Sequence, residues 1–153
     1  MGKIEITKKV LGICATNCYT VVDTETKEAL IIDPADRADV LIRDWKDKGV
    51  TPTAVLLTHG HFDHIGALAG VKKEYPEIRV YAAAEEKEVM ESPALNLSSS
   101  FGAAFTAQAD IYLEDGAEIE VLGRKCKCLL VPGHTKGGMC YYFPEEHVVF
   151  TGD

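Results

Sequence analysis

The sequence reads Ala54-Val55-Leu56-Leu57-Thr58-His59-Gly60-His61-Phe62-Asp63-His64 in its first half. The apolar residues at the start of this stretch are typical of a short strand that is buried on both faces. The pattern His-x-His-x-Asp-His follows directly. Imidazole nitrogens and carboxylate oxygens are the ligands that zinc and similar divalent ions take in proteins. We therefore expect His59 and His61 to bind one metal ion, and Asp63 and His64 to bind a second ion nearby.

The alternative interpretation of this stretch is a polar turn whose histidines only cap a helix. It is disfavoured because imidazoles placed so close together repel one another on protonation unless something binds them. Two more ligand types follow later apolar runs, namely His134 after Pro132-Gly133 and Asp153 after Thr151-Gly152. Glycine before each of them allows a sharp turn. Either residue alone is typical of an ordinary turn, but together with the first cluster they complete a ligand set.

Two interpretations stay open for Asp33 and for Lys136, whereas only a surface position is expected for His147. Asp33 ends an apolar run before Pro34 and could hydrogen-bond a metal-binding histidine or cap a turn or helix. Lys136, close to His134, could meet an anionic substrate, although an exposed lysine is more often simply solvated. His147 follows a polar turn and is expected to be exposed.

Hydrophobic periodicity predicts strands and helices in an alternating order. Helix 36–48 carries an apolar face at Ala38, Leu41, Ile42 and Trp45, with Asp36 as its N-cap and Gly49 as its end. The other expected elements are strands 4–10, 17–23, 29–32 and 54–57, helix 63–75, strand 78–82, helix 83–90, a loop or broken helix over 92–108, and strands 117–121, 125–131, 139–143 and 147–151. This order predicts a single domain, 1–153, of the α/β (α+β) class, with two sheets covered by helices.

Composition limits the function further. The formal net charge of −8 disfavours nucleic acid as a partner, because phosphate binding requires clustered lysine and arginine. The chain lacks an apolar run long enough for a membrane span and lacks a secretory signal, so we expect a cytoplasmic protein without membrane partners. Its odd number of cysteines is expected to stay reduced. Cys126 and Cys128 should face one side of a sheet as core residues, with a metal role as the less favoured alternative.

The motifs quoted above resemble those of the metallo-β-lactamase superfamily. Asn17-Cys18-Tyr19 and Gly133-His134-Thr135-Lys136-Gly137-Gly138 are similar to its glyoxalase II (hydroxyacylglutathione hydrolase) branch. The resemblance implies an αββα sandwich that here lacks its last strand and helices. It also implies that a further histidine of the second metal site would lie beyond Asp153, so that the sequence is expected to be truncated.

The resemblance also assigns roles to residues. His59, His61 and His134 would bind the first metal, Asp63 and His64 the second, and Asp153 would bridge the two; Asp63 and Asp153 are the expected catalytic residues. One or two zinc ions are the expected cofactor, with iron or manganese as alternatives. The truncated edge is a candidate surface for self-association, and the oligomeric state stays open.

Hydrolysis of a small thioester, such as a hydroxyacylglutathione, is the leading functional hypothesis. A metal-acidified water would attack the acyl carbonyl, and the leaving thiol needs little help because its pKa is only about 8.5. One alternative is a mononuclear iron persulfide dioxygenase. Another is a truncated domain that binds metal without turnover.

Overall fold

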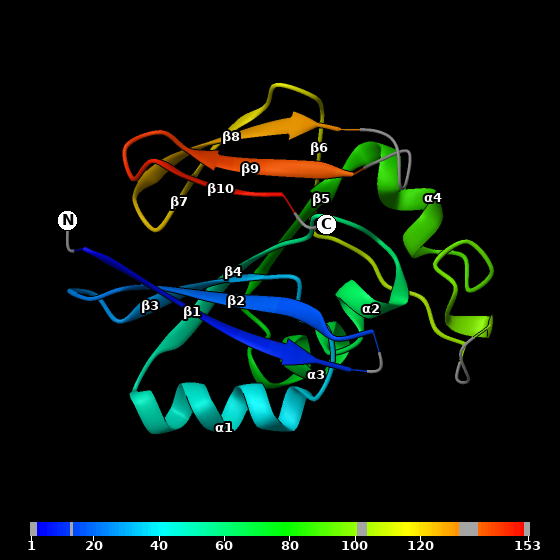
Figure 1. Ribbon diagram of the computed structural model, residues 1–153, viewed down its shortest axis with the longest axis horizontal. Helices are drawn as coiled ribbons and strands as arrows, with labels where there is room; N and C mark the ends of the chain where they lie inside the picture. Colours follow the sequence, from blue (N-terminus) through cyan, green and yellow to red (C-terminus); the bar gives the residue numbers. More distant parts are fainter. Residues whose placement is uncertain (1–2, 13, 101–103, 132–137, 152–153) are drawn as a thin grey trace.

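Two β-sheets pack face to face in the computed structural model of the protein, and helices cover the outer face of one of them (Figure 1). The structure describes residues 3–12, 14–100, 104–131 and 138–151. The predicted α/β sandwich is confirmed. In Figure 1, α1 and α3 lie below the first sheet and the second sheet lies above it.

The first sheet has six strands in the order β1-β2-β3-β4-β5-β6. Their bounds are β1 Ile4–Leu11, β2 Thr16–Asp23, β3 Glu28–Ile32, β4 Thr51–Leu56, β5 Arg79–Ala83 and β6 Ile111–Leu113. Strands β1, β2 and β3 are antiparallel, as their short hairpin connections require, whereas β3 to β6 run parallel. The carboxyl ends of the parallel strands therefore meet at one edge, where open α/β sheets usually carry their sites.

The second sheet is antiparallel, in the order β10-β9-β8-β7. Its strands are β7 Glu118–Val121, β8 Arg124–Leu130, β9 Met139–Phe143 and β10 Val148–Phe150. Strand β8 alternates buried and exposed side chains: Cys126 and Cys128 are buried, whereas Lys125, Lys127 and Leu129 are exposed. The prediction that both cysteines face the core is confirmed.

Helix α1 (Ala38–Lys48) follows the prediction closely, with Leu41 and Trp45 fully buried. It ends at Gly49, whose φ of 67° suits glycine. Asp36 as the N-cap was a wrong prediction. The N-cap position is Arg37, in the left-handed region at φ 54°, and Asp36 Oδ1 accepts a hydrogen bond from the Arg37 backbone instead.

The predicted helix 63–75 is instead two short helices, α2 (Phe62–Ile65) and α3 (Leu68–Glu74). The break has a tertiary cause. A Cβ on Gly66 would lie 2.2 Å from the Ala35 carbonyl oxygen, so the chain after β3 presses directly on this point. The Ala67 N–H then donates to the Pro34 carbonyl at 2.9 Å instead of continuing a helix.

The predicted helix 83–90 and the predicted loop 92–108 are largely found, whereas the strand that follows them was not predicted. Helix 83–90 appears as the 3-10 turn η1 (Ala84–Glu86) followed by α4 (Lys87–Met90). The described part of 92–108 is loop apart from the 3-10 turn η2 (Ser98–Ser100). Strand β6 was missed, because its three residues form a strand only by pairing with β5.

Two apolar clusters hold these layers together. One lies between α1, α3 and the first sheet and includes Trp45, whose Nε1 donates to Thr20 Oγ1 at 3.1 Å. The other lies between the two sheets and includes Cys126, Cys128 and Tyr141. None of the helices in the described part of the chain combines the length and the apolar composition of a membrane span.

Candidate metal centre

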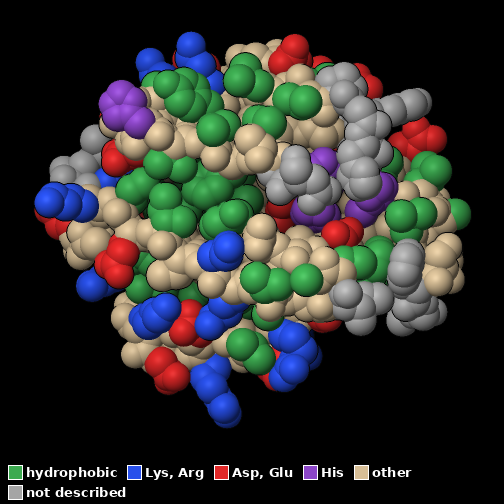
Figure 2. Space-filling model, in the orientation of Figure 1, with side chains coloured by type: hydrophobic (Ala, Val, Ile, Leu, Met, Phe, Trp, Pro, Cys, Tyr) green, Lys and Arg blue, Asp and Glu red, His purple; other side chains and the backbone are tan. Residues whose placement is uncertain are grey.

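The residues predicted to bind metal lie where the parallel strands end. Strand β3 leads to Asp33, β4 leads to residues 58–64, and β5 leads to Glu86. We call residues 58–64 the histidine loop. Histidine and acidic side chains gather at this end of the sandwich (Figure 2). Residues distant in sequence thus meet because parallel strands place their carboxyl ends along one edge.

His59, Asp63 and His64 lie close together within the histidine loop. The rings of His59 and His64 are 4.9 Å apart between centroids and are tilted by 51°. Asp63 Oδ2 lies 3.4 Å from His64 Nε2 and accepts a hydrogen bond from Thr16 Oγ1 at 2.8 Å. Both histidines are buried. The arrangement brings two imidazoles and a carboxylate to one place that is largely shielded from water.

Asp33 orients the two buried histidines. Its Oδ2 lies 2.9 Å from His64 Nδ1 and also accepts a hydrogen bond from the Thr58 hydroxyl. Thr58 Oγ1 in turn lies 3.1 Å from His59 Nδ1. Because the Thr58 hydroxyl donates to Asp33, its oxygen can accept a hydrogen bond from the His59 Nδ1–H. Both histidines are then held with the proton on Nδ1, which leaves Nε2 as the basic nitrogen.

Of the two interpretations left open for Asp33, the contact with a predicted ligand histidine is therefore confirmed. The carboxylate also accepts the Thr58 backbone N–H at 2.7 Å, so it ties the end of β3 to the start of the histidine loop. Asp33 adopts φ 51°, a left-handed conformation that aspartate tolerates better than most residues.

His61 is half-buried at the N-cap position of α2. The backbone on both sides of it is fixed by residues from a later segment. The Gly60 N–H donates to Glu86 Oε1 at 2.6 Å, and the Phe62 N–H donates to the Asn96 carbonyl at 2.7 Å. Sequence reasoning missed Thr16, Glu86 and Asn96. For Glu86 a signal existed, since it is an acidic residue shortly after a buried strand, as Asp33 is.

His134, Asp153 and Lys136 lie outside the described residues. The described residues on either side of 132–137 do bear on His134. The Val131 N–H donates to the Gly138 carbonyl at 2.7 Å, and the Met139 N–H donates to the Thr58 carbonyl at 2.9 Å. A Cβ on Gly138 would lie 3.3 Å from His59 Nε2. Gly138 therefore lies beside His59, and Met139 is hydrogen-bonded to Thr58, the residue before His59.

The thiols of the cysteines nearest the histidine loop have raised pKa values. Partial desolvation and then the Asp63 carboxylate raise the pKa of the Cys14 thiol. Burial and then the Asp33 carboxylate raise the pKa of Cys18 to about 12. Because both pKa values are raised, both thiols are protonated at neutral pH. Cys126 and Cys128 are core residues between the sheets. His147 is exposed, as predicted.

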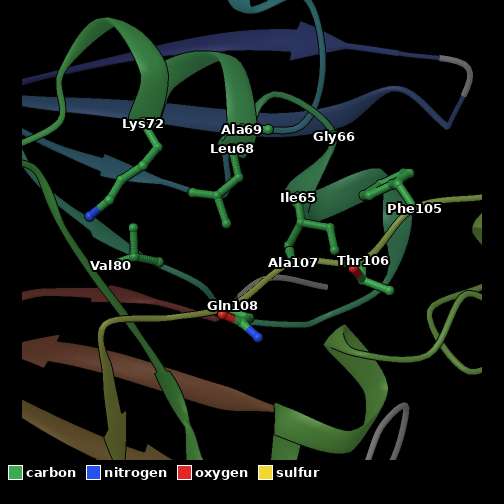
Figure 3. Close-up of a pocket in the computed structure, with 10 residues that line it drawn as sticks. All are labelled: Ile65, Gly66, Leu68, Ala69, Lys72, Val80, Phe105, Thr106, Ala107 and Gln108. Carbon is green, nitrogen blue, oxygen red and sulfur yellow. The ribbon is translucent and has the colours of Figure 1, made fainter.

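A largely apolar pocket of about 510 Å³ is lined in part by the residues that directly follow the histidine loop in the sequence (Figure 3). Ile65, Leu68, Val80 and Ala107 are among its lining residues. Lys72 also lines it, but its Nζ is hydrogen-bonded to the Ile78 carbonyl at 2.6 Å and to Asp110 Oδ2 at 2.7 Å. No predicted metal ligand is among the described residues that line this pocket.

Within the residues that the structure describes, no three His, Cys, Asp or Glu side chains already form a group that could hold a metal ion. The predicted set also draws on His134 and Asp153. The chemistry of the described donors nevertheless fits a divalent cation, because neutral imidazole nitrogens and a carboxylate suit zinc, iron or manganese. The hydrogen bonds of Asp33 supply the orientation that metal-binding histidines usually receive.

Comparison with known proteins gives a consistent picture. The sequence profile of the metallo-beta-lactamase superfamily matches residues 11–153. The chain is 35% identical over 145 residues to the probable metallo-hydrolase YqgX of Bacillus subtilis (strain 168). The matched region covers 94% of this chain and 67% of that protein. It is 32% identical over 127 residues to a hydroxyacylglutathione hydrolase of Synechococcus sp. (strain ATCC 27144 / PCC 6301 / SAUG 1402/1), spanning 83% of this chain and 43% of that protein.

Among solved structures, the BLEG-1 B3 metallo-beta-lactamase superposes with a TM-score of 0.88 at 37% identity, covering 96% of this chain and 71% of that chain. The chain thus spans between about half and two thirds of the length of the curated relatives it matches.

Proposed function

Since the chain belongs to the metallo-beta-lactamase superfamily, we propose that its histidine loop holds one or two divalent cations and that the protein hydrolyses a small thioester. The observation that carries the proposal is the meeting of His59, Asp63 and His64, with the His59 and His64 rings 4.9 Å apart and Asp63 Oδ2 3.4 Å from His64 Nε2. The proposed ligand set is His59, His61 and His134 for one cation and Asp63 and His64 for another, with Asp153 between them.

The chemistry that a divalent cation supplies at such a site is activation of water and stabilisation of negative charge on an acyl oxygen. The chain's own residues prepare the site. Asp33 keeps the Nδ1 protons on His59 and His64, so that both Nε2 atoms are available as ligands. Thr16 holds the Asp63 carboxylate in place through one of its oxygens.

A thioester suits this site for a chemical reason. A thiol leaves with a pKa of about 8.5, so it departs as thiolate without a strong general acid. The raised pKa values of Cys14 and Cys18 lower the fraction of each thiol that is present as the nucleophilic thiolate at neutral pH. The similarity to a hydroxyacylglutathione hydrolase supports a hydroxyacyl thioester of glutathione as the first substrate to assay.

A second candidate reaction is hydrolysis of a β-lactam, which the similarity to the BLEG-1 B3 metallo-beta-lactamase favours. In both reactions water attacks an acyl carbonyl, and the C–S or C–N bond to the leaving group breaks. They differ in the leaving group, because a lactam nitrogen needs a proton to depart and a thiolate does not. A direct comparison of a hydroxyacylglutathione with a chromogenic cephalosporin therefore separates them.

The test is a thiol-release assay on the zinc-loaded protein and on two variants. Asp63→Ala removes a proposed ligand and is expected to abolish hydrolysis of the thioester. The matched control is Asp39→Ala, because Asp39 is exposed on α1 and forms a surface ion pair with Arg37. Unchanged turnover in Asp63→Ala would refute the proposed site. Faster hydrolysis of the cephalosporin than of the thioester would refute the proposed substrate.

A further inference from the structure

A second buried carboxylate, besides Asp33, contacts the histidine loop. Glu86 is 1% exposed, and its Oε1 accepts a hydrogen bond from the Gly60 N–H at 2.6 Å. A hydrogen bond to a charged acceptor is shorter and stronger than a neutral one. The peptide group that is held in this way joins His59 to Gly60, directly before His61. Glu86 therefore acts on the backbone between two proposed ligands.

The packing around Gly60 leaves no room for a side chain at this position. A Cβ on Gly60 would lie 2.7 Å from Met90 Cγ and 2.9 Å from Glu86 Cγ. Both distances are shorter than real Cβ contacts allow, so only glycine fits between the loop and the segment formed by η1 and α4. The side chains of Glu86 and Met90 thus set how closely the loop approaches that segment.

The same segment continues to a second point of attachment. Asn96 is fully buried, and its carbonyl accepts the Phe62 N–H at 2.7 Å. Its side-chain Nδ2 donates to the Phe105 carbonyl at 2.9 Å and to the Met90 carbonyl at 3.3 Å. These bonds fix Asn96 to the end of α4. The backbone amides on both sides of His61 are therefore held by one connected support, residues 84–96.

We propose that Glu86 is a positioning residue for the metal ligands, and that it sets the directions of His59 and His61 by holding the Gly60 amide. This inference rests on the proposed function, because it requires a cation at the histidine loop. It assigns Glu86 a role distinct from that of Asp33. Asp33 orients the rings of His59 and His64 through their Nδ1 atoms, whereas Glu86 orients the backbone from which His59 and His61 project.

Loss of the carboxylate has a direct consequence. Without Glu86 the Gly60 N–H is left without its buried acceptor, and an unsatisfied buried donor is costly enough for the backbone to move toward another partner. Rotation of this peptide changes the backbone angles ψ of His59 and φ of Gly60, and with them the direction of His59 relative to His61. Residues that support metal ligands typically change metal affinity by about 10–100-fold when they are removed.

The experiment measures zinc affinity by competition with a chromogenic chelator, and the visible absorption spectrum of the cobalt-substituted protein. Glu86→Ala is expected to weaken zinc binding by about 10–100-fold and to change the cobalt spectrum. Glu86→Gln retains a carbonyl acceptor for the Gly60 N–H and is expected to restore both. Glu85→Ala is the matched control, because Glu85 is the adjacent residue of the same turn and is exposed. Thermal unfolding of the metal-free variants is measured in parallel.

The outcomes separate positioning from simple stability. A lower melting temperature of Glu86→Ala with the zinc affinity and cobalt spectrum of the wild type overturns the inference. If Glu86→Ala does not fold, Glu86→Asp replaces it, because the shorter side chain keeps the charge but draws it away from Gly60. Weaker zinc binding by Glu86→Asp than by Glu86→Gln supports the inference, and equal binding overturns it.

The same experiment distinguishes this inference from the proposed function. Zinc binding that depends on Glu86, in a protein without thioester hydrolysis, leaves the positioning role intact and refutes only the reaction. Absence of zinc binding in the wild-type protein refutes both.

Discussion

Replacement of Asp33 by asparagine should weaken metal binding without unfolding the protein. Asparagine is nearly the same shape as aspartate and also tolerates the φ of 51° found at this position. Its carbonyl oxygen can still accept the Thr58 backbone N–H, which is now held at 2.7 Å. The amide nitrogen, however, replaces an acceptor with a donor, and it faces the Thr58 hydroxyl and His64 Nδ1.

The magnitude follows from this reversal. His64 Nδ1 lies 2.9 Å from the atom that becomes a donor, so the ring is favoured with its proton on Nε2, the nitrogen proposed to bind metal. Binding then requires the other tautomer, in which two buried donors face each other. A buried donor without an acceptor costs about 1–3 kcal/mol. That cost corresponds to a loss of about 5–150-fold in affinity.

Zinc affinity by chelator competition is the assay, with the melting temperature of the metal-free protein as a second readout. Asp36→Asn is the matched control, since Asp36 is nearby in sequence but exposed. We expect Asp33→Asn to bind zinc at least several-fold more weakly and the control to bind it like the wild type. Wild-type zinc affinity in Asp33→Asn would refute the inference that Asp33 determines the tautomers of the histidines.

Two further predictions concern the buried Arg124, whose ion pair with Asp23 joins the two sheets and whose pair with Glu146 lies within the second sheet. Arg124→Ala removes a buried guanidinium that donates to Asp23 Oδ2 and Glu146 Oε1, each at 2.8 Å. Breaking a buried pair from one side costs about 3–5 kcal/mol. A chemical denaturation curve should show this loss in the free energy of unfolding. The hydrogen bond from Arg124 lowers the pKa of Asp23 from 3.8 to about 2, so its stabilising effect is present above the ordinary pKa and is lost as the pH falls from about 4 to about 2; circular dichroism should follow this loss in the wild type, and an equally large loss in Arg124→Ala would contradict it.

Local patterns were sufficient for much of the fold. Helix α1 was predictable because Leu41 and Trp45 lie on the face set by helical periodicity, and because Gly49 ends it. The break between α2 and α3 was not predictable, because it depends on the contact of Gly66 with the Ala35 carbonyl, which only the folded chain creates. The same reason applies to β6, which is a strand only because β5 lies beside it.

The site divides in the same way. The histidine loop was visible because several ligand types are adjacent in sequence. For Asp33 the sequence left two interpretations open. The choice between them depends on where β3 and β4 end relative to each other. Glu86 is one of several acidic residues in its segment. Its position after a buried strand is a weak signal, and the inward direction of its side chain is seen only in the folded chain, where it meets the Gly60 N–H.

The central claim is that side chains of the histidine loop bind a cation through nitrogens oriented by Asp33. Anomalous diffraction from zinc-loaded crystals, recorded on both sides of the zinc absorption edge, tests it most directly. We expect a zinc peak at about 2.0–2.1 Å from the Nε2 atom of His59, with the His64–Asp33 hydrogen bond retained. Zinc bound elsewhere, or a His59 ring that turns away from the peak, would refute cation binding by the histidine loop.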